Sequence, residues 1–169
     1  MSIYFLKIQA VLLFVSNILK AILSDLLFLR MLIPFLYLGI LAAVAWADGH
    51  TRTIPDFFSL AILVLGVAAL WLFPEHGLAD RLAGLIIIAL PMLLLTLLFR
   101  RGFGGGDIKL MAASGFLLGW RAMLSATFFG LIAAAVFCVW QLLLGKMNRK
   151  SAFPLGPFLV IGLMIEMLL

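Results

Sequence analysis

Residues 122–144 read AMLSATFFGLIAAAVFCVWQLLL and contain no charged side chain. A membrane-spanning helix needs about 20 consecutive apolar residues. Backbone amides in lipid have no water to bond, so only helices or closed barrels can span a bilayer. A run of this length without strict alternation of apolar and polar residues is typical of a helix rather than a barrel strand. We therefore predict a transmembrane helix here.

Similar apolar runs recur along the 169-residue chain, at 3–23, 32–47, 57–73, 82–99, 108–118 and 153–169. Hydrophobic residues make up 66% and charged residues 11% of the chain, whereas soluble domains average about 45–50% apolar and about 25% charged. So small a soluble fold could not bury that much apolar surface, and a disordered or nucleic-acid-binding chain is excluded as well. The predicted fold is an all-α, polytopic membrane helical bundle of about six to seven transmembrane helices, with no room for a soluble domain.

The N-terminal run differs from the others because it carries a polar stripe on one helical face, formed by Gln9, Ser16, Lys20 and Ser24. It either spans the membrane or lies in the interface. Polar residues interrupt it and no clean small-x-small site follows, so it does not read as a cleavable signal peptide. We predict two parts, an extra N-terminal helix in residues 1–31 and a six-helix membrane core in residues 32–169.

The basic residues indicate the orientation of the bundle. Three connections, at 48–56, 100–107 and 145–151, are expected on one face of the membrane, and they hold Arg52, Arg100, Arg101, Lys146, Arg149 and Lys150. The connections on the opposite face hold Arg30, Arg81 and Arg121, together with the acids Asp25, Glu75 and Asp80, which we expect to be solvated loop charges. Cytoplasmic loops carry the excess of Lys and Arg, so the first face is predicted to be cytoplasmic.

Two aspartates stand at membrane boundaries. Asp48 directly follows the apolar run 32–47, and Asp107 precedes the apolar run 108–118. Two predicted helices separate them, so both lie at the same depth on the same side. Two carboxylates in close contact share one proton, so one can take a proton from water while the other donates to a scissile carbonyl. The pair therefore indicates aspartyl protease chemistry.

The glycines Gly104, Gly105 and Gly106 immediately precede Asp107. Glycine permits unusual backbone conformations and close approach of another chain, so an extended substrate is expected to lie along residues 102–106. Pro154 and Pro157 are expected to keep the last helix from closing the site. These glycines and prolines could instead serve helix packing alone, or the glycines a flexible linker, and Asp107 is also a favoured helix N-cap. A phosphate loop is excluded because no Gly-Lys-Ser/Thr follows.

Three stretches resemble motifs of the type IV prepilin peptidases. Asp48, followed after five residues by Ile54-Pro55, resembles the first catalytic motif of that family. The stretch GGGDIKL at 104–110 resembles its second motif, the GxGD motif of intramembrane aspartyl proteases. The stretch FPLGPFL at 153–159 is similar to the start of its last helix. The resemblance covers about residues 32–169, with the motifs in the order of the family.

The resemblance implies an aspartic endopeptidase of the bacterial inner membrane that cleaves the basic leader of a prepilin at the cytoplasmic face. Asp48 and Asp107 would be the catalytic pair, without a metal or cofactor. The residues expected to position substrate or loop are Pro55, Gly104, Gly105, Gly106, Lys109, Pro154 and Pro157. The compact length resembles the short enzymes of tight-adherence (Flp-type) pilus systems.

The chain departs from the family at two points. Asp56 stands where many members have Asn. Full-length members carry a cytoplasmic insert with two CxxC pairs and also N-methylate the new terminus, whereas this chain has one cysteine, Cys138, and no such insert. The resemblance therefore extends to the peptidase reaction and not to methylation. The sequence does not indicate an oligomeric state.

Two other classes of membrane protein remain open. A small transporter can also place paired acids in broken helices, but no repeat is visible and both acids lie at the boundary rather than at the midplane. A non-catalytic subunit of a pilus or secretion machine would not need both Asp48 and Asp107. Presenilin-type proteases carry the first aspartate inside a helix beside Tyr, whereas Asp48 follows Ala47.

Overall fold

The computed structural model describes residues 2–51, 53–99, 103–144 and 156–169, with backbone alone at 2–14, 21, 22 and 51. Every regular element in these ranges is an α-helix, which confirms the predicted all-α bundle. The helices are α1 (Ser2–Thr51), α2 (Asp56–Leu72), α3 (Leu78–Ile87), α4 (Ala89–Leu98), α5 (Gly105–Leu118), α6 (Trp120–Leu143) and α7 (Gly156–Leu168).

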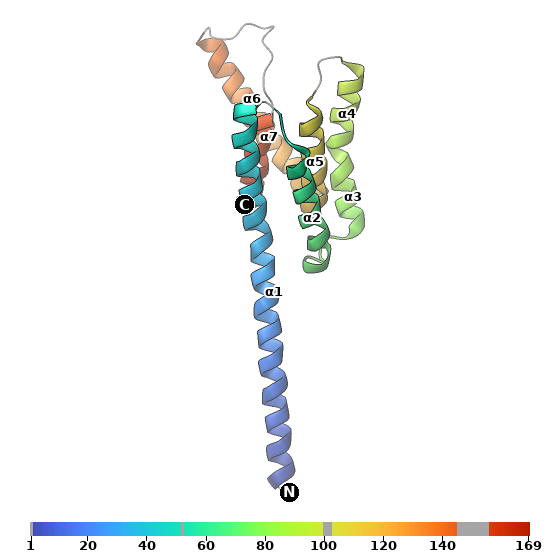
Figure 1. Ribbon diagram of the computed structural model, residues 1–169, viewed down its shortest axis with the longest axis vertical. Helices are drawn as coiled ribbons and strands as arrows, with labels where there is room; N and C mark the ends of the chain where they lie inside the picture. Colours follow the sequence, from blue (N-terminus) through green and yellow to red (C-terminus); the bar gives the residue numbers. More distant parts are fainter. Residues whose placement is uncertain (1, 52, 100–102, 145–155) are drawn as a thin grey trace.

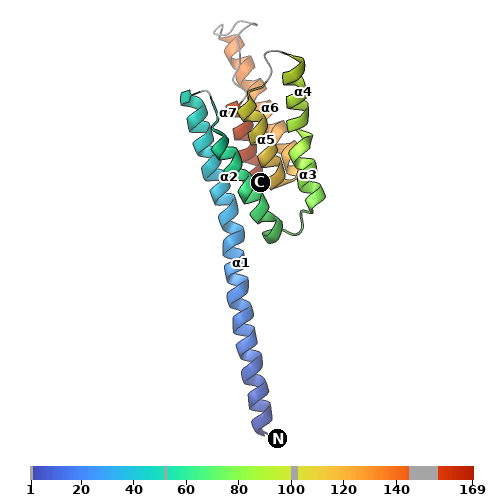
Figure 2. The same ribbon diagram turned by 45° about the vertical axis from the view of Figure 1, so that its right-hand side comes forward.

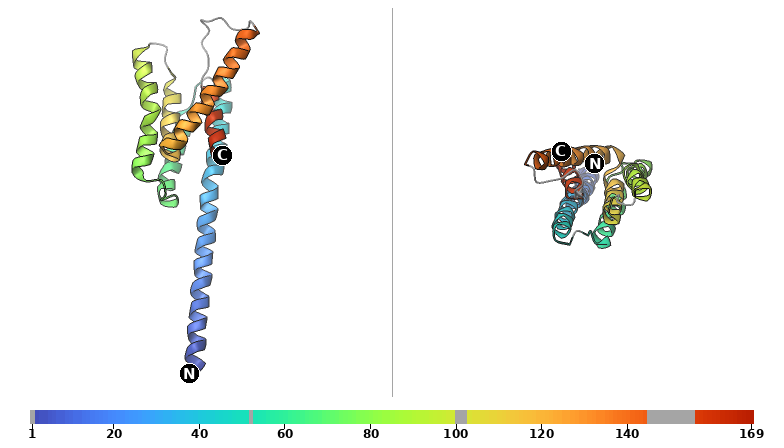
Figure 3. Two further views of the ribbon diagram at one scale, coloured as in Figure 1. Left: turned by 180° about the vertical axis from the view of Figure 1, so that it is seen from behind. Right: turned by 90° about the horizontal axis from the view of Figure 1, so that it is seen from above.

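Helix α1 is far longer than the bundle that it joins (Figure 1). Its 50 residues correspond to about 75 Å. The C-terminal half packs in the bundle, and the N-terminal half extends away from the other helices (Figure 2). Seen from behind and from above, the other helices stand to one side of the upper part of α1 (Figure 3), which packs against α2 and α7.

The separation predicted between the runs 3–23 and 32–47 is absent, because α1 is continuous through both. Asp25 and Arg30 therefore lie within a helix and not in a loop. Residues 24–33 contain neither glycine nor proline, so nothing in this stretch ends the helix despite its two charges. Arg30 pairs with Glu75 in the connection between α2 and α3, and this contact marks where α1 leaves the bundle. The division at residue 31 stays a prediction.

The predicted run 82–99 forms two helices, α3 and α4, that meet at Ile88. Pro91 explains the interruption, because it has no N–H to donate to the carbonyl of Ile87. Among the described residues, three stretches are long and apolar enough to cross a membrane, namely Val15–His50, Leu78–Leu98 and Trp120–Leu143. Helices α2 and α7 are shorter apolar helices. The chain is thus built as a multi-pass membrane protein.

Glycines allow neighbouring helices to approach closely. A Cβ added at Gly84 of α3 would collide with the backbone of Gly115 of α5, and the reverse also holds. A Cβ at Gly162 of α7 would collide with the backbone of α6 at Ala126 and Gly130. Small residues at such crossings are the usual means of packing helices in lipid, where no hydrophobic driving force acts between helices.

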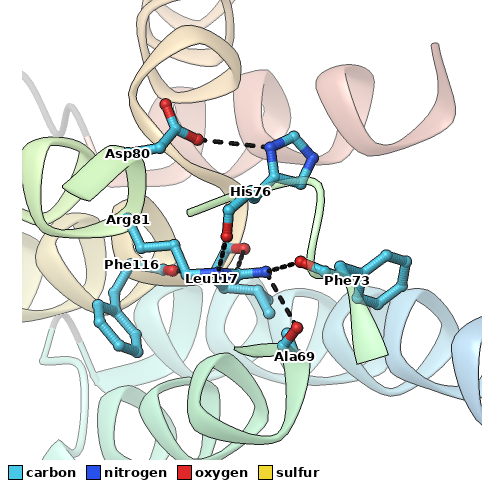
Figure 4. Close-up of polar contacts among 7 residues, drawn as sticks. All are labelled: Ala69, Phe73, His76, Asp80, Arg81, Phe116 and Leu117. Carbon is cyan, nitrogen blue, oxygen red and sulfur yellow. Dashed lines mark hydrogen bonds and ion pairs between the residues drawn. The ribbon is translucent and has the colours of Figure 1, made fainter. Parts of the chain in front are cut away.

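Arg81 is the largest fully buried side chain in the described part of the protein, with 1% exposure. Its guanidinium donates to the carbonyls of Leu117 at 2.7 Å and Ala69 at 3.1 Å (Figure 4). Longer bonds reach three further carbonyls, those of His76, Phe116 and Phe73. Four of these five acceptors lie at the ends of α2 and α5, where many carbonyls lack a partner within the helix, although those of Ala69 and Phe73 also accept a backbone N–H. The prediction of Arg81 as an outer-loop charge is wrong, since it lies in α3 and joins the ends of two helices.

The chain direction defines two ends of the bundle. The Asp48 end holds the C-terminal ends of α1, α4 and α6 and the N-terminal ends of α2, α5 and α7 (Figure 1). The Arg81 end holds the C-terminal ends of α2 and α5 and the N-terminal ends of α3 and α6. Asp80, also predicted in a loop, lies in the first turn of α3 at the Arg81 end, where its carboxylate is 3.4 Å from Nδ1 of His76.

Candidate active site

Asp48 lies in the last turn of α1, on the face of the helix that packs into the bundle. Tyr37, Leu41 and Val44 are all fully buried. The spacing from these residues to Asp48 follows the helical repeat of three and four, which places them on one face. Asp48 itself is partly exposed. The interior face of α1 therefore carries the carboxyl group to the Asp48 end of the bundle.

Asp107 lies in the first turn of α5, at the same end. Gly104 is the N-cap residue of this helix, in an extended conformation with φ −63° and ψ 142°. A Cβ added at Gly104 would lie 3.2 Å from Oδ2 of Asp107, so the carboxylate folds back over the start of the helix. The N-cap residue is therefore Gly104, three residues before the predicted Asp107. The Asp107 side chain nevertheless lies beside the N-terminal turn of α5.

The carboxyl groups of Asp48 and Asp107 converge on Gly156, the buried first residue of α7. A Cβ added there would lie 2.9 Å from Oδ1 of Asp107 and 3.0 Å from Oδ2 of Asp48. The two oxygens are therefore less than about 6 Å apart, the sum of those distances. Three helices far apart in the sequence thus meet at one point, and only glycine leaves room there for both carboxyl groups.

The surroundings of Asp107 favour its protonated form. It precedes the apolar residues of α5, outside the stretches long enough to span the membrane. Burial raises the pKa of Asp107 above its ordinary value of 3.8, and the negative charge of Asp48 raises it further. A backbone hydrogen bond with Gly104 acts in the opposite direction. Since like charges this close do not both ionise readily, the pair can hold a single proton, with Asp107 as the protonated member.

The two predicted motifs are packed against each other. A Cβ added at Gly106 would lie 2.9 Å from Cβ of Ile54 and 3.1 Å from its carbonyl oxygen. The close backbone approach expected at Gly106 is therefore present, but it is made by Ile54 of the same chain. Pro55 follows as the N-cap residue of α2, with φ −62° and ψ 137°. The Ile-Pro stretch thus packs on the glycine run that leads to Asp107.

Lys109, predicted to position substrate, pairs with Asp56 across the same junction. Its Nζ lies 2.6 Å from Oδ2 of Asp56, and both side chains are exposed. Ion pairs so exposed contribute about 0–1 kcal/mol. The pair therefore links the N-terminal parts of α2 and α5 without fixing them.

The remaining predicted residues lie around the pair with less contact. Gly105 is exposed, and an added Cβ would meet nothing within 4 Å. Pro157 is partly exposed in the first turn of α7. Pro154 lies outside the described residues, as does residue 102. His50 donates or accepts within its own helix, with Nδ1 2.9 Å from the carbonyl oxygen of Trp46.

Gly156 is the site residue that sequence reasoning missed. It was part of the stretch 153–159, and the signal was a glycine between two prolines at the start of an apolar run. Within the ranges that the structure describes, no group of three or more His, Cys, Asp or Glu side chains could hold a metal ion. A carboxylate beside a protonated carboxyl group is an arrangement in which one group can take a proton from water while the other donates a proton.

Comparisons with known proteins bear on this site. A family model described as the type IV leader peptidase family matches residues 35–139, a range that includes both Asp48 and Asp107. The chain is 29% identical over 130 residues to the prepilin leader peptidase/N-methyltransferase of Bacillus subtilis (strain 168), covering 75% of this chain and 51% of that protein.

Two further relatives carry the same name. The protein from Burkholderia pseudomallei (strain 1026b) is 31% identical over 127 residues, covering 72% of this chain and 41% of the relative. The protein from Dickeya chrysanthemi is 30% identical over 143 residues, covering 79% and 49%. The chain spans about half the length of these curated relatives. No solved structure matches the chain.

Proposed function

Because this chain belongs to the type IV leader peptidase family, we propose that it is an aspartic endopeptidase that removes the basic leader from a type IV (Flp-like) prepilin. The proposal rests above all on one observation, the convergence of the Asp48 and Asp107 carboxyl groups on Gly156. The curated relatives are prepilin leader peptidases by name, which supports the substrate class. The proposal covers the peptidase reaction and does not include N-methylation.

The reaction assigns a different role to each aspartate. Asp48, in its ionised form, takes a proton from a water molecule, and the oxygen of that water attacks the scissile carbonyl carbon. Asp107, protonated, gives its proton to the carbonyl oxygen, so that a neutral tetrahedral diol forms. When the diol collapses, the C–N bond breaks, Asp48 passes its proton to the amine nitrogen and Asp107 recovers one from a hydroxyl group. The raised pKa of Asp107 supports this assignment.

The membrane setting follows from the charges at the two ends of the bundle. The connections at the Asp48 end carry six of the 12 lysine and arginine residues in the sequence, and basic connections face the cytoplasm. We place the site at the cytoplasmic face of the bacterial inner membrane. The apolar helix of the prepilin lies in lipid beside the enzyme, and its leader remains in the cytoplasm. The scissile bond must be extended for attack, because a helix engages its carbonyls in hydrogen bonds.

Open backbone near the aspartate pair supports a place for this extended segment. Gly105 is exposed and has free space around it, whereas Gly106 is in contact with Ile54. The substrate backbone is therefore proposed to run beside Gly104 and Gly105. Pro157, in the first turn of α7 on the other side of the aspartate pair, has no backbone N–H to donate to the substrate.

The test is cleavage of a prepilin by isosteric variants. Asp48→Asn and Asp107→Asn are each expected to lower cleavage by on the order of 10³-fold or more, because asparagine cannot exchange the proton that each role needs. Asp25→Asn, a change at an exposed acid far along α1, is the matched control. Cleaved product and membrane-integrated protein are measured in the same cells. Near-normal turnover by either catalytic variant would contradict the pair and favour a non-catalytic subunit or a small transporter.

A further inference from the structure

A threonine on α4 holds the segment that leads to Asp107. Thr96 lies in the last turn of α4, and its hydroxyl donates to the carbonyl of Met92 at 2.8 Å. The same oxygen accepts the backbone N–H of Phe103 at 2.9 Å, and it lies 3.5 Å from the carbonyl of Phe103. Phe103 directly precedes Gly104, the N-cap residue of α5. One hydroxyl group therefore connects the end of α4 to the start of α5.

The Thr96 hydroxyl provides a hydrogen-bond acceptor for the backbone N–H of Phe103. A partly buried N–H without a partner is costly, so the Phe103 amide requires an acceptor. The Phe103 side chain packs against the hydrophobic core, which keeps its backbone at this place. Among the described residues of α4, only Ala89 and Met92 are buried. No other side-chain hydrogen bond of the described part joins α4 to another element, so this contact has few substitutes.

Asp107 is thus held from two sides. On one side Ile54 packs against Gly106. On the other side Thr96 fixes Phe103, four residues before Asp107. The first contact sets α5 relative to α2, and the second sets it relative to α4. Both contacts act on the residues just before Asp107, so they bear on how far its carboxyl group lies from that of Asp48.

We propose that Thr96 is a positioning residue for Asp107, acting through the hydrogen bond to Phe103 to set the separation of the two catalytic carboxyl groups. The proposal rests on the proposed function for its catalytic consequence. It does not make Thr96 a catalytic residue, because its hydroxyl contacts only the backbone of Met92 and Phe103. Removing the hydroxyl frees the start of α5 without creating a cavity in the core.

Three substitutions separate positioning from general stability. Thr96→Val keeps the shape and removes the hydroxyl, and Thr96→Ser keeps the hydroxyl. Thr127→Val on α6 is the matched control, because Thr127 makes the same bond to a carbonyl four residues earlier, that of Met123 at 2.7 Å, without reaching a connection. We expect Thr96→Val to lower kcat about 5–10-fold with KM nearly unchanged, because a displaced Asp107 carboxyl group slows the chemical step more than it weakens substrate binding. Thr96→Ser and Thr127→Val should stay within about twofold of the wild type.

A distance measurement tests the same idea without activity. Gly49 and Gly105 flank the aspartate pair, and an added Cβ at either would meet nothing within 4 Å. Nitroxide labels at Gly49→Cys and Gly105→Cys, in a Cys138→Ser background, report the separation of the ends of α1 and α5. Thr96→Val should broaden the distance distribution, and Thr96→Ser should leave it as in the parent protein.

The outcomes distinguish this proposal from the proposed function. If the wild type does not cleave a prepilin but Thr96→Val broadens the distances, the proposed function fails and the positioning role of Thr96 stands. If the wild type cleaves and Thr96→Val changes neither kcat nor the distances, the positioning role is refuted. It is also refuted if Thr96→Val lowers folded protein and activity together and Thr96→Ser restores neither.

Discussion

Adding one methyl group at Gly156 should separate the catalytic carboxyl groups. The Cβ of Gly156→Ala would lie 2.9 Å from Asp107 and 3.0 Å from Asp48, whereas ordinary contact begins at 3.4 Å. The two oxygens must therefore retreat by about 0.5 Å and about 0.4 Å, so their separation grows by up to about 0.9 Å. A misplacement of about 1 Å can cost about 10²-fold in rate. We expect kcat to fall about 10- to 100-fold.

The strain should fall on the carboxyl groups and not on the fold. Helix α7 cannot move away, because Gly162 already packs against the backbone of α6. A carboxyl group ends a flexible side chain and can rotate at little cost. Folded Gly156→Ala protein should therefore reach the membrane at nearly the normal level, while the reaction slows.

The assay is cleavage of a purified prepilin by detergent-solubilised enzyme, with kcat and KM determined separately. Gly49→Ala is the control, because it adds a methyl group next to Asp48 where nothing lies within 4 Å. It should retain nearly full kcat. If Gly156→Ala cleaves as fast as Gly49→Ala, the carboxyl groups do not meet across Gly156 during the reaction, and the assigned geometry is wrong.

Three further predictions concern the contacts around the pair. Gly106→Val should lower cleavage more than tenfold while the protein still inserts, because its side chain displaces Ile54; Gly49→Val, in open space and away from the proposed substrate path, should lose less, and equal loss would contradict the contact. Cleavage should fall as pH rises through the raised pKa of Asp107, because the protonated form is lost. The folded state keeps this proton above pH 3.8, where the unfolded chain loses it, so stability should also fall as pH rises from 3.8 through the raised pKa. A series of melting curves at different pH values should show that Asp107→Asn removes this loss of stability. Arg81→Met should destabilise the protein by about 1–3 kcal/mol, because the Leu117 carbonyl loses the Arg81 donor, whereas the Ala69 carbonyl keeps the N–H of Phe73; an unchanged unfolding midpoint would refute the capping role.

Apolar runs predicted most helices, because a backbone that crosses lipid must satisfy its own hydrogen bonds and a helix does so. The run 122–144 is matched by α6 (Trp120–Leu143), and the run 57–73 by α2 (Asp56–Leu72). The prediction was wrong where charged residues were taken as the sign of a loop. Asp25 and Arg30 lie within α1, because a charged residue ends a helix only when the backbone or packing also favours a break.

The candidate site was predictable in part for a similar reason. Counting spans between Asp48 and Asp107 predicts that both lie at one end, and the helices confirm that placement. The convergence on Gly156 depends on how α7 crosses α1 and α5, and no spacing in the sequence encodes that crossing. Arg81 was also missed, because its five carbonyl partners come from segments that only the fold brings together.

The buried guanidinium of Arg81 fixes the end of the bundle that is remote from the aspartates. Arg81 ties the final carbonyls of α2 and α5 to α3, and the backbones of Gly84 and Gly115 touch nearby. Helix α5 is 14 residues long, which is about 21 Å. A tilt of only about 3° about the fixed end would carry Asp107 through about 1 Å, a displacement comparable to those that alter reaction rates in active sites. The separation of Asp48 and Asp107 is thus sensitive to rotations of α5 that would scarcely move its Arg81 end.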